Sequence, residues 1–459
     1  MYYALKESTR LRMEDPAPIM FSVKESETYF SLNPIYSFLM ASCNGYKTEH
    51  DLRTIVKEGF GYEKEKTDKI FKGFLNLCKP FLDITPEPHD IKERYSPFDF
   101  LYELKGIPAV HRLRSPVQVN WLVTYRCPYD CVYCCIPITP ANSPKDGEMT
   151  TDEGFAFLED CVNTDVTDLT FHGGEPFLRP DLPDFIKYLV EHDIWVKTST
   201  KLPLGNQLLK RLRDSGLQQL QISIDSPAAQ IATDMVGGIP NYLKKAFRNI
   251  KRLQEYGIEP TGNAVVTSRN IKGIPKLVRM LADAGVRDIS LSSLIRSYYK
   301  PVDHLFPSVE EIVQLHEDLK EMEPDLPEDM EIDLPDRMDP RDGALCDSVA
   351  ATCAGGKLGI VIAPNGDASI CDRLLTFRGA IVGNVNQSTI QEIWDGKALD
   401  RFVNPKIEDY QESTCGACSG FDGCSGRIRC HFRAMHIEGK LFTSDYLCKG
   451  TDAPAMKFF

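Results

Sequence analysis

Three cysteines stand in the order Cys127-x3-Cys131-x2-Cys134, and this spacing constrains the chain more than any other feature of its 459 residues. A cubane iron–sulfur cluster has four irons and normally takes four thiolates. One short loop with three cysteines can hold three of these irons and leave the fourth open for another ligand. The spacing alone also allows a zinc site or a group of buried core thiols, so other parts of the chain must decide.

A second motif, Gly173-Gly174-Glu175-Pro176, follows the apolar residues 169–171. The apolar run predicts a strand. Glycines permit a close approach to the backbone, here expected to be that of a ligand, and the proline fixes the turn that follows. A pair of glycines alone is weak evidence, but its place after a strand and downstream of the cysteine loop favours a ligand-binding edge.

The two motifs together resemble the radical S-adenosylmethionine (SAM) family. The resemblance implies that Cys127, Cys131 and Cys134 hold a [4Fe–4S] cluster whose open iron chelates the amino and carboxylate groups of SAM. It also implies that Tyr133 packs near the adenine and that the Gly-Gly-Glu-Pro element binds the amino group of SAM.

Two further strand ends resemble SAM-binding elements of this family. Residues 222–226 are similar to its Ser-Leu-Asp-Gly element near the ribose and methionine end of SAM, which implies cofactor-binding roles for Ser223 and Asp225. Ser199, at the end of the preceding strand, is expected to make a further ribose contact. A strand-end or helix cap is the alternative for each. Many family members carry an arginine shortly after this element, for the SAM carboxylate, but residues 234–238 contain none.

The C-terminal region holds a second group of cysteines, with Gly366 between two of them. Their order resembles the SPASM extension of radical SAM peptide-modifying enzymes, which carries two auxiliary [4Fe–4S] clusters. The resemblance implies one cluster on Cys346, Cys353, Cys371 and Cys430 and another on Cys415, Cys418, Cys424 and Cys448. The gap between Cys424 and Cys430 is wider than usual for the family. Two tetrahedral zinc sites are the alternative.

Asp372 directly follows Cys371, a position at which related SPASM enzymes can place a catalytic acid. An ionised carboxylate there would take a proton as the substrate radical is oxidised, and a salt bridge or cap is the alternative. The leftover Cys43, Cys78 and Cys161 lie in apolar helical patterns and are expected to be core thiols. The role of Cys135, next to Cys134, stays open.

The composition restricts the environment and the partners. Fifteen cysteines favour metal or redox use in a reducing cytosol. Residues 1–12 have no apolar core of a signal peptide, and the sequence has no apolar run long enough to span a membrane. We therefore expect a cytoplasmic protein without a membrane partner. The net charge of −13 argues against a nucleic-acid partner, since phosphate binding draws on clustered Lys and Arg.

Strand and helix patterns alternate through the middle of the chain. The strand candidates are 117–124, 168–172, 194–198, 219–225, 260–267 and 288–294. A helix is expected from Thr151, with a capping box at Thr150 and Glu153, and further helices at 182–192 and 242–256. This alternation predicts an α/β fold with a parallel sheet, a partial (β/α)6 barrel of the TIM type. The cysteine loop, Gly173 and Asp225 would then all lie at carboxyl ends of strands.

The N-terminal residues 1–88 are expected to form a unit of their own. Two paired strands, 19–23 and 28–32, and helices at 34–41, after Thr48 and at 64–77 predict a winged helix-turn-helix domain. The pattern resembles the peptide-recognition domain of ribosomal peptide maturases, which captures a leader peptide as an added strand. The alternatives are a structural cap on the barrel and a DNA-binding redox regulator.

The expected domains are a recognition domain (1–88), a linker (89–115), the radical SAM barrel (116–305), a bridge (306–345) and the SPASM domain (346–459). As a whole, the chain resembles a radical SAM/SPASM maturase of a ribosomally synthesised precursor peptide. The resemblance implies three [4Fe–4S] clusters, SAM, and a flavodoxin or ferredoxin as low-potential electron donor. A 5′-deoxyadenosyl radical would abstract a hydrogen atom from the peptide, and an auxiliary cluster would accept the surplus electron.

An oxidative cross-link is the expected product. Eight cysteines are available for two auxiliary clusters, so neither needs a substrate thiolate, which favours a carbon–carbon or carbon–oxygen bond. A thioether-forming maturase of the sactipeptide or ranthipeptide type is the first alternative. A protein oxidase of the anaerobic sulfatase-maturating type is the second.

Overall fold

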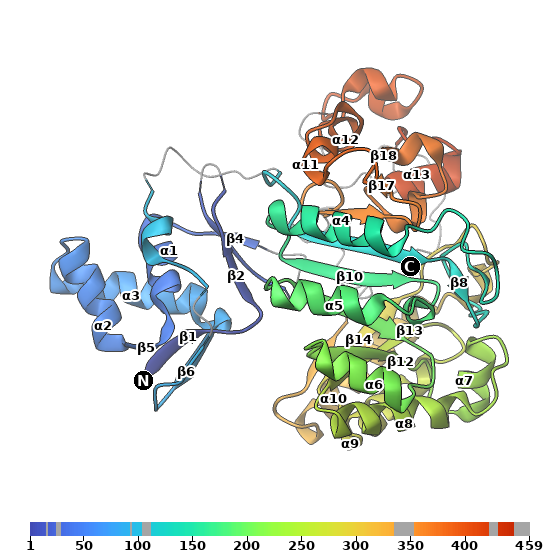
Figure 1. Cartoon of the computed structure of the whole chain (residues 1–459), viewed down its shortest axis with the longest axis horizontal. Coiled ribbons are helices and arrows are strands. Elements are labelled where there is room, and N and C mark those ends of the chain that lie inside the picture. Colours follow the sequence, from blue (N-terminus) through green and yellow to red (C-terminus); the bar gives the residue numbers. More distant parts are fainter. Residues whose placement is uncertain are drawn as a thin grey trace. The chain divides into compact units, whose positions relative to one another are not determined.

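The computed structural model (Figure 1) has two compact units, Met1–Arg114 and Ser115–Phe459. The structure describes residues 1–14, 17–23, 29–91, 94–102, 112–334, 353–421 and 430–444. The predicted ligands Cys346, Cys424 and Cys448 lie outside these described residues.

Within its described residues, the first unit contains two small sheets and three α-helices. One sheet has the order β5-β1-β6 and the other the order β2-β3-β4. The strands are β1 (Tyr2–Leu5), β2 (Thr9–Arg12), β3 (Ile19–Ser22), β4 (Tyr29–Ser31), β5 (Asn44–Thr48) and β6 (Leu82–Thr85). The helices are α1 (Pro34–Ser42), α2 (Glu49–Thr54) and α3 (Lys64–Cys78). The predicted antiparallel pair β3–β4 and the three helices are confirmed.

The first unit extends beyond the expected boundary at residue 88. A short 3-10 helix, Pro97–Phe100, packs Phe100 into the same core as Leu39 and Phe74. The hydroxyl of Ser37 donates a hydrogen bond to the Phe100 carbonyl at 3.3 Å. Much of the expected linker therefore belongs to the core of this unit, and Cys43 and Cys78 are confirmed as core thiols in it.

The second unit is built on one ten-stranded sheet, in the order β15-β14-β13-β12-β11-β10-β7-β16-β17-β18. All six predicted strands are present, consecutive and parallel. They are β7 (Gln118–Thr124), β10 (Asp168–Gly173), β11 (Trp195–Thr200), β12 (Gln219–Ser223), β13 (Glu259–Val266) and β14 (Asp288–Ser293). Two more strands, β15 (Glu331–Asp333) and β16 (Gly359–Ile362), extend the parallel part beyond the expected six.

The cysteine-rich C-terminal region shares this sheet with the barrel strands. Its strand β16 pairs directly with β7, and β17 (Asp367–Ser369) and β18 (Ile381–Asn384) continue the sheet. Gly366, with φ +86°, forms the turn between β16 and β17, so Cys371 follows β17 closely. The expected separate domain from residue 346 is thus joined to the barrel by strand pairing.

Helices follow most of the parallel strands, and α4 and α5 lie along β10 in Figure 1. The helices of this unit are α4 (Thr151–Asn163), α5 (Leu182–Glu191), α6 (Asn206–Asp214), α7 (Ala229–Met235), α8 (Tyr242–Glu255), α9 (Ile274–Asp283), α10 (Val309–Met322), α11 (Ile390–Trp394), α12 (Lys397–Val403) and α13 (His431–Glu438). The predicted capping box at Thr150 and Glu153 is confirmed. Among the described residues, no helix has the length and apolar character of a membrane span.

The core packed against α4 and α5 shows which face of the sheet each strand residue lies on. Trp121 is fully buried there against the rings of Phe157 and Phe171, and Cys161 lies in the same core, as predicted. Successive strand residues point to opposite faces. Thr170 and His172, which alternate with Phe171, therefore face the inside of the curved sheet.

Candidate functional site

The cysteine loop begins where β7 ends. Cys127 closes the short strand β8 (Arg126–Cys127), which pairs with β9 (Thr139–Pro140) beyond the loop. Burial raises the pKa of Cys127 to about 11 and that of Cys131 to about 12, and Cys134 contributes to both shifts. The three thiols therefore lie near one another in a partly buried position.

This donor set fits an iron–sulfur cluster. In the described part of the chain, no group of three Cys, His, Asp or Glu side chains is arranged to hold a single metal ion. The fit rests on the chemistry of the donors, because Cys127, Cys131 and Cys134 are soft sulfur ligands from one loop that influence one another's ionisation. Iron would hold these thiols as thiolates in spite of their burial.

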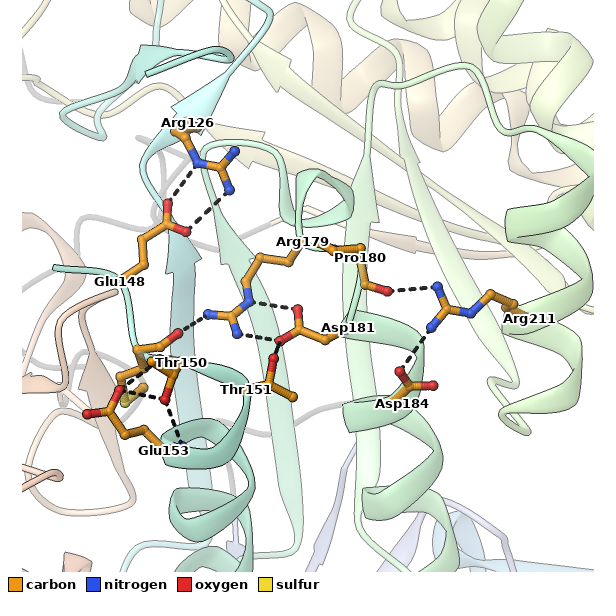
Figure 2. Close-up of polar contacts among 11 residues, drawn as sticks. Arg126, Glu148, Thr150, Thr151, Glu153, Arg179, Pro180, Asp181, Asp184 and Arg211 are labelled. Atoms are coloured by element: carbon orange, nitrogen blue, oxygen red, sulfur yellow. Dashed lines mark hydrogen bonds and ion pairs between the residues drawn. The ribbon is translucent and has the colours of Figure 1, made fainter. Parts of the chain in front are cut away.

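A buried ion pair fixes the start of the loop, as Figure 2 shows. Arg126 donates from Nε to Glu148 Oε1 at 2.9 Å and from Nη2 to Oε2 at 3.2 Å. The two side chains are only 8% and 10% exposed, and the Thr124 hydroxyl also donates to Glu148. Since Arg126 immediately precedes Cys127, this bidentate pair sets the direction in which the loop leaves β7. Nothing in the local sequence pattern predicts it.

The far side of the loop rests on the segment around Met235, the last residue of α7. The Val132 N–H donates to the Met235 carbonyl at 3.1 Å. Gly237 has φ +79°, and a Cβ there would lie 2.8 Å from the Asp130 carbonyl oxygen. The stretch without the expected arginine therefore supports the loop through its backbone. The Ser297 hydroxyl adds a hydrogen bond to the Cys134 carbonyl at 2.8 Å.

The two glycines of the Gly-Gly-Glu-Pro element approach protein backbone, not open space. A Cβ on Gly173 would lie 2.3 Å from the Thr124 carbonyl oxygen, and one on Gly174 would lie 2.3 Å from that of Arg126. The Gly174 N–H donates to Thr124 at 2.7 Å. The structure uses the absence of a Cβ at both glycines to bring this turn against the start of the cysteine loop, and the expected ligand contact of Gly173 and Gly174 stays a prediction.

Glu175 is buried at the centre of the site, with 2% of its surface exposed. Its Oε1 accepts from the Thr200 hydroxyl at 2.8 Å and the Phe177 N–H at 3.3 Å, and its Oε2 accepts from the Lys201 N–H at 3.1 Å. Burial raises the pKa of Glu175 to about 7, and these hydrogen bonds and the Lys201 charge oppose the shift. A nearby ammonium group would favour its ionised form. Pro176 begins the short 3-10 helix that follows.

Asp225 connects the cysteine loop to the next strands. Its Oδ2 accepts from the Tyr133 hydroxyl at 2.6 Å, and its Oδ1 accepts from the Val265 N–H at 3.0 Å. Tyr133 and Asp225 thus meet beside the cysteines. Ser223 lies at the end of β12, where its carbonyl accepts from the Tyr242 hydroxyl. Ser199 lies on β11, and within the described residues its hydroxyl has no hydrogen-bond partner.

Lys201, directly after β11, lies in this site and was missed by the sequence analysis. Its carbonyl accepts from the Tyr129 hydroxyl at 2.5 Å. Burial alone would lower the pKa of Lys201, but the negative charges of Cys131, Asp225 and Glu175 outweigh it and raise the pKa. No motif marks this lysine, because only the folded loop brings it beside the cysteines.

Three of the predicted auxiliary ligands lie together. Burial raises the pKa of Cys353, with a further contribution from Cys430, and burial also raises the pKa of Cys371, to which Cys353 contributes. Cys415 and Cys418 share one turn, in which the Cys418 N–H donates to the Cys415 carbonyl at 3.1 Å. Cys353, Cys371 and Cys430 therefore lie near one another, and their roles as cluster ligands, like those of Cys415 and Cys418, stay a prediction.

Asp372 lies between Cys371 and the carboxyl end of β10. Its Oδ1 is 3.5 Å from Cys371 Sγ and 3.9 Å from Arg373 Nε. Burial lowers the pKa of His172, and the Asp372 carboxylate opposes that shift. Burial raises the pKa of Cys135 to about 12, and Asp372 adds to it. The Asp372 carboxylate thus lies beside Cys371 and near His172, the residue that precedes Gly173.

Two family models match this chain, one over the cysteine-loop region and one over the C-terminal cysteine region. The model of the radical SAM superfamily matches residues 121–281, and that of the SPASM iron–sulfur cluster-binding domain matches residues 353–419. The chain is similar to the PqqA peptide cyclase of Granulibacter bethesdensis, with 25% identity over 73% of this chain and 88% of the relative. The PqqA peptide cyclase of Xanthomonas campestris is 26% identical over 74% of this chain and 88% of its own length.

Solved structures show the same fold. Streptococcus suis SuiB aligns with a TM-score of 0.66 at 15% identity, over 97% of this chain and all of its own. SuiB has also been solved with its precursor peptide SuiA and with SAM. The protein anSMEcpe with bound SAM aligns with a TM-score of 0.52 at 17% identity, over 68% of this chain and 89% of its own.

Two groups of thiols, a buried carboxylate beside one of them and the two matching domain models identify the cofactors as SAM and [4Fe–4S] clusters. Residues 121–281 therefore match a radical SAM domain and residues 353–419 a SPASM iron–sulfur cluster-binding domain, and the protein is a radical SAM enzyme.

Proposed function

We propose that this enzyme installs an oxidative cross-link in a ribosomally synthesised precursor peptide. The observation that carries the proposal is the combination, in one chain, of the radical SAM site with a separate first unit that has an open strand edge. The similarity to PqqA peptide cyclases over 73–74% of the chain supports it, as does the likeness to SuiB, which was solved with a precursor peptide.

Residues 1–114 are the proposed binding unit for the leader of this peptide, as a winged helix-turn-helix domain. In the described residues, β4 pairs only with β3, so its other edge has no strand neighbour. Ser31 is exposed on β4, and Phe30 is 36% exposed. An open edge with an exposed aromatic side chain suits an extended peptide that adds as a strand. The opposite edge strand, β2, is buried along its whole length.

The residues of the first cluster site receive distinct roles in this proposal. Cys127, Cys131 and Cys134 hold the cluster, and bound SAM with that cluster supplies the hydrogen-abstracting radical chemistry. The carboxylate of Glu175 attracts the ammonium of SAM. Tyr133 lies near the adenine, and its hydrogen bond to Asp225 fixes its ring.

The hydroxyls of Ser199 and Ser223 face the ribose in this proposal, because both serines stand at carboxyl ends of neighbouring strands. Asp225 acts beside them mainly through Tyr133 and β13, since both of its carboxylate oxygens already accept hydrogen bonds.

In this proposal, residues of the SPASM region serve to accept the proton and the electron that the substrate loses. Asp372 takes the proton lost by the substrate, because it is the carboxylate nearest to Cys371 on the side of His172. Cys346, Cys353, Cys371 and Cys430 would hold one auxiliary cluster, and Cys415, Cys418, Cys424 and Cys448 would hold the other. Such a cluster would supply an acceptor for the surplus electron, and a flavodoxin or ferredoxin would be the external low-potential donor for SAM cleavage.

A carbon–carbon or carbon–oxygen bond is the proposed product, since eight protein cysteines suffice for both auxiliary clusters. The test is coexpression with a candidate precursor peptide, followed by mass measurement of the peptide. We expect the loss of two hydrogen atoms. An unchanged peptide mass, with SAM consumed normally, would contradict the maturase proposal. A modification that disappears only when a core-peptide cysteine is replaced by alanine would show a thioether instead.

A further inference from the structure

Lys201 stands where the cysteine loop meets the Gly-Gly-Glu-Pro turn. Its backbone N–H donates to Glu175 Oε2 at 3.1 Å, and its carbonyl accepts from the Tyr129 hydroxyl at 2.5 Å. Tyr129 belongs to the cysteine loop. Because both backbone groups of Lys201 are bonded, the start of its side chain is fixed relative to the two elements that form the first cluster site.

The ammonium of Lys201 points into this site. It lies 5.8 Å from the centre of the Tyr133 ring, and the charges that act on it come from Cys131, Asp225 and Glu175. Within the described residues, this ammonium makes no hydrogen bond or ion pair of its own. A partly buried ammonium without a partner is costly, so the site is suited to an anionic ligand group.

The neighbouring carboxylates are already engaged. Asp225 accepts from Tyr133 and from the Val265 N–H, and Glu175 accepts three hydrogen bonds. These bonds hold the two carboxylates in place beside the ammonium. The site therefore presents fixed carboxylates and a nearby ammonium, which together match the ammonium and carboxylate of an amino acid.

Other cations near the loop have partners. Arg126 is paired with Glu148, and Lys300 is paired with Asp130. The segment 234–238 carries no basic residue, and Met235 is fully buried. Among the described cations whose charges act on Cys127, Cys131 and Cys134, Lys201 is the one without an ion pair.

We propose that the Lys201 ammonium binds the carboxylate of SAM. The inference rests on the proposed SAM pocket and assigns a partner to the SAM carboxylate, for which residues 234–238 offer no arginine. An ammonium presents three donors from a flexible stem and can follow the carboxylate as SAM chelates iron. Glu175 would face the amino group of the same amino-acid end.

The test compares two ligands on the protein with its clusters reconstituted under anaerobic conditions. One ligand is SAM, and the other is S-adenosylmethioninamine, which lacks the carboxylate. Equilibrium dialysis gives Kd for each with the wild type, Lys201→Met and Lys201→Arg. The ligand without the carboxylate would also lose one of the two groups with which SAM chelates iron, and this loss is the same in every protein. The informative quantity is therefore the ratio of the two Kd values in each protein.

We expect Lys201→Met to reduce that ratio by about 10- to 100-fold, as a charge-assisted hydrogen bond is lost. Lys201→Arg should restore part of it. Lys197→Met is the matched control, because Lys197 lies on β11, the strand that Lys201 follows, but its ammonium is 3.9 Å from Asp168 Oδ1. This control should leave the ratio unchanged.

Two results would contradict the role of Lys201. If Lys201→Met weakened both ligands by the same factor, or weakened neither, Lys201 would act only through Glu175 or the loop. The comparison of both ligands on the wild type needs no variant, so a folding defect leaves it intact, and equal affinities there would also overturn the inference. Failure of the wild type to bind SAM at all would contradict the pocket itself.

Discussion

The Tyr133 hydroxyl donates a hydrogen bond to Asp225 Oδ2 at 2.6 Å, so the cysteine loop is bonded directly to the residues that follow the carboxyl end of β12. The other oxygen of Asp225 accepts from the Val265 N–H of β13. One buried carboxylate therefore connects the loop, β12 and β13. The position of the aromatic ring between Cys131 and Cys134 depends on this connection.

Tyr133→Phe should weaken SAM binding and lower the melting temperature. The change leaves Oδ2 of the buried Asp225 without this donor, at a cost of about 1–3 kcal/mol. The matched control is Tyr256→Phe, whose hydroxyl has no hydrogen bond within the described residues. Calorimetric melting and SAM dialysis measure both effects. Equal melting temperatures for the two variants would show that the Tyr133–Asp225 bond contributes little.

Glu175 should make stability depend on pH. Burial raises its pKa from 4.5 to about 7 in the folded protein, so folding favours the protonated form. Its contribution to stability is therefore full below about pH 4.5 and is lost as the pH rises through 7. Relative to Glu175→Gln, the wild-type protein without clusters should become less stable between pH 5 and 8. If the melting temperatures of both proteins changed by the same amount with pH across this range, the raised pKa of Glu175 would be contradicted.

Asp372→Asn should separate SAM cleavage from product formation. The amide cannot take the substrate proton, so the yield of modified peptide should fall by about 100-fold or more, while 5′-deoxyadenosine is still produced. Asp367→Asn is the control, because Asp367 lies on β17, the strand that precedes Cys371 and Asp372, and its carboxylate accepts a hydrogen bond from the Asn365 side chain at 2.8 Å. Unchanged peptide yield in Asp372→Asn would assign this carboxylate to structure.

Removal of residues 1–114 should abolish tight binding of the precursor and leave peptide-independent SAM cleavage. The unit has its own core, with Leu39, Phe71 and Phe74 fully buried, so residues 1–114 alone should bind the leader peptide. Fluorescence anisotropy with a labelled leader measures both. Equal affinity of the full and shortened chains would make the first unit a cap.

Much of the fold follows from local patterns. The six parallel strands and the capping box of α4 could be predicted because periodicity and caps are properties of neighbouring residues. The pairing of β16 with β7 could not, since it joins residues more than two hundred positions apart through a four-residue strand. Phe100 joined the first unit for a similar reason, through one buried ring in a polar stretch.

The site divides in the same way. Cysteines and the Gly-Gly-Glu-Pro element could be recognised from spacing, because their chemistry requires those residue types close together. Arg126, Glu148 and Lys201 could not, as each acts through a partner that only the fold brings near. The segment around Met235 supports the cysteine loop through a backbone carbonyl, and the residue types in the sequence do not reveal such a contact.

The central claim is that Cys127, Cys131 and Cys134 hold the cluster that cleaves SAM. The most direct measurement is the production of 5′-deoxyadenosine by the reduced enzyme, with the wild type and the triple Cys→Ala variant side by side and their iron contents determined. We predict that the triple variant produces none and keeps the iron of its auxiliary sites. Normal 5′-deoxyadenosine production by the triple variant would contradict the account.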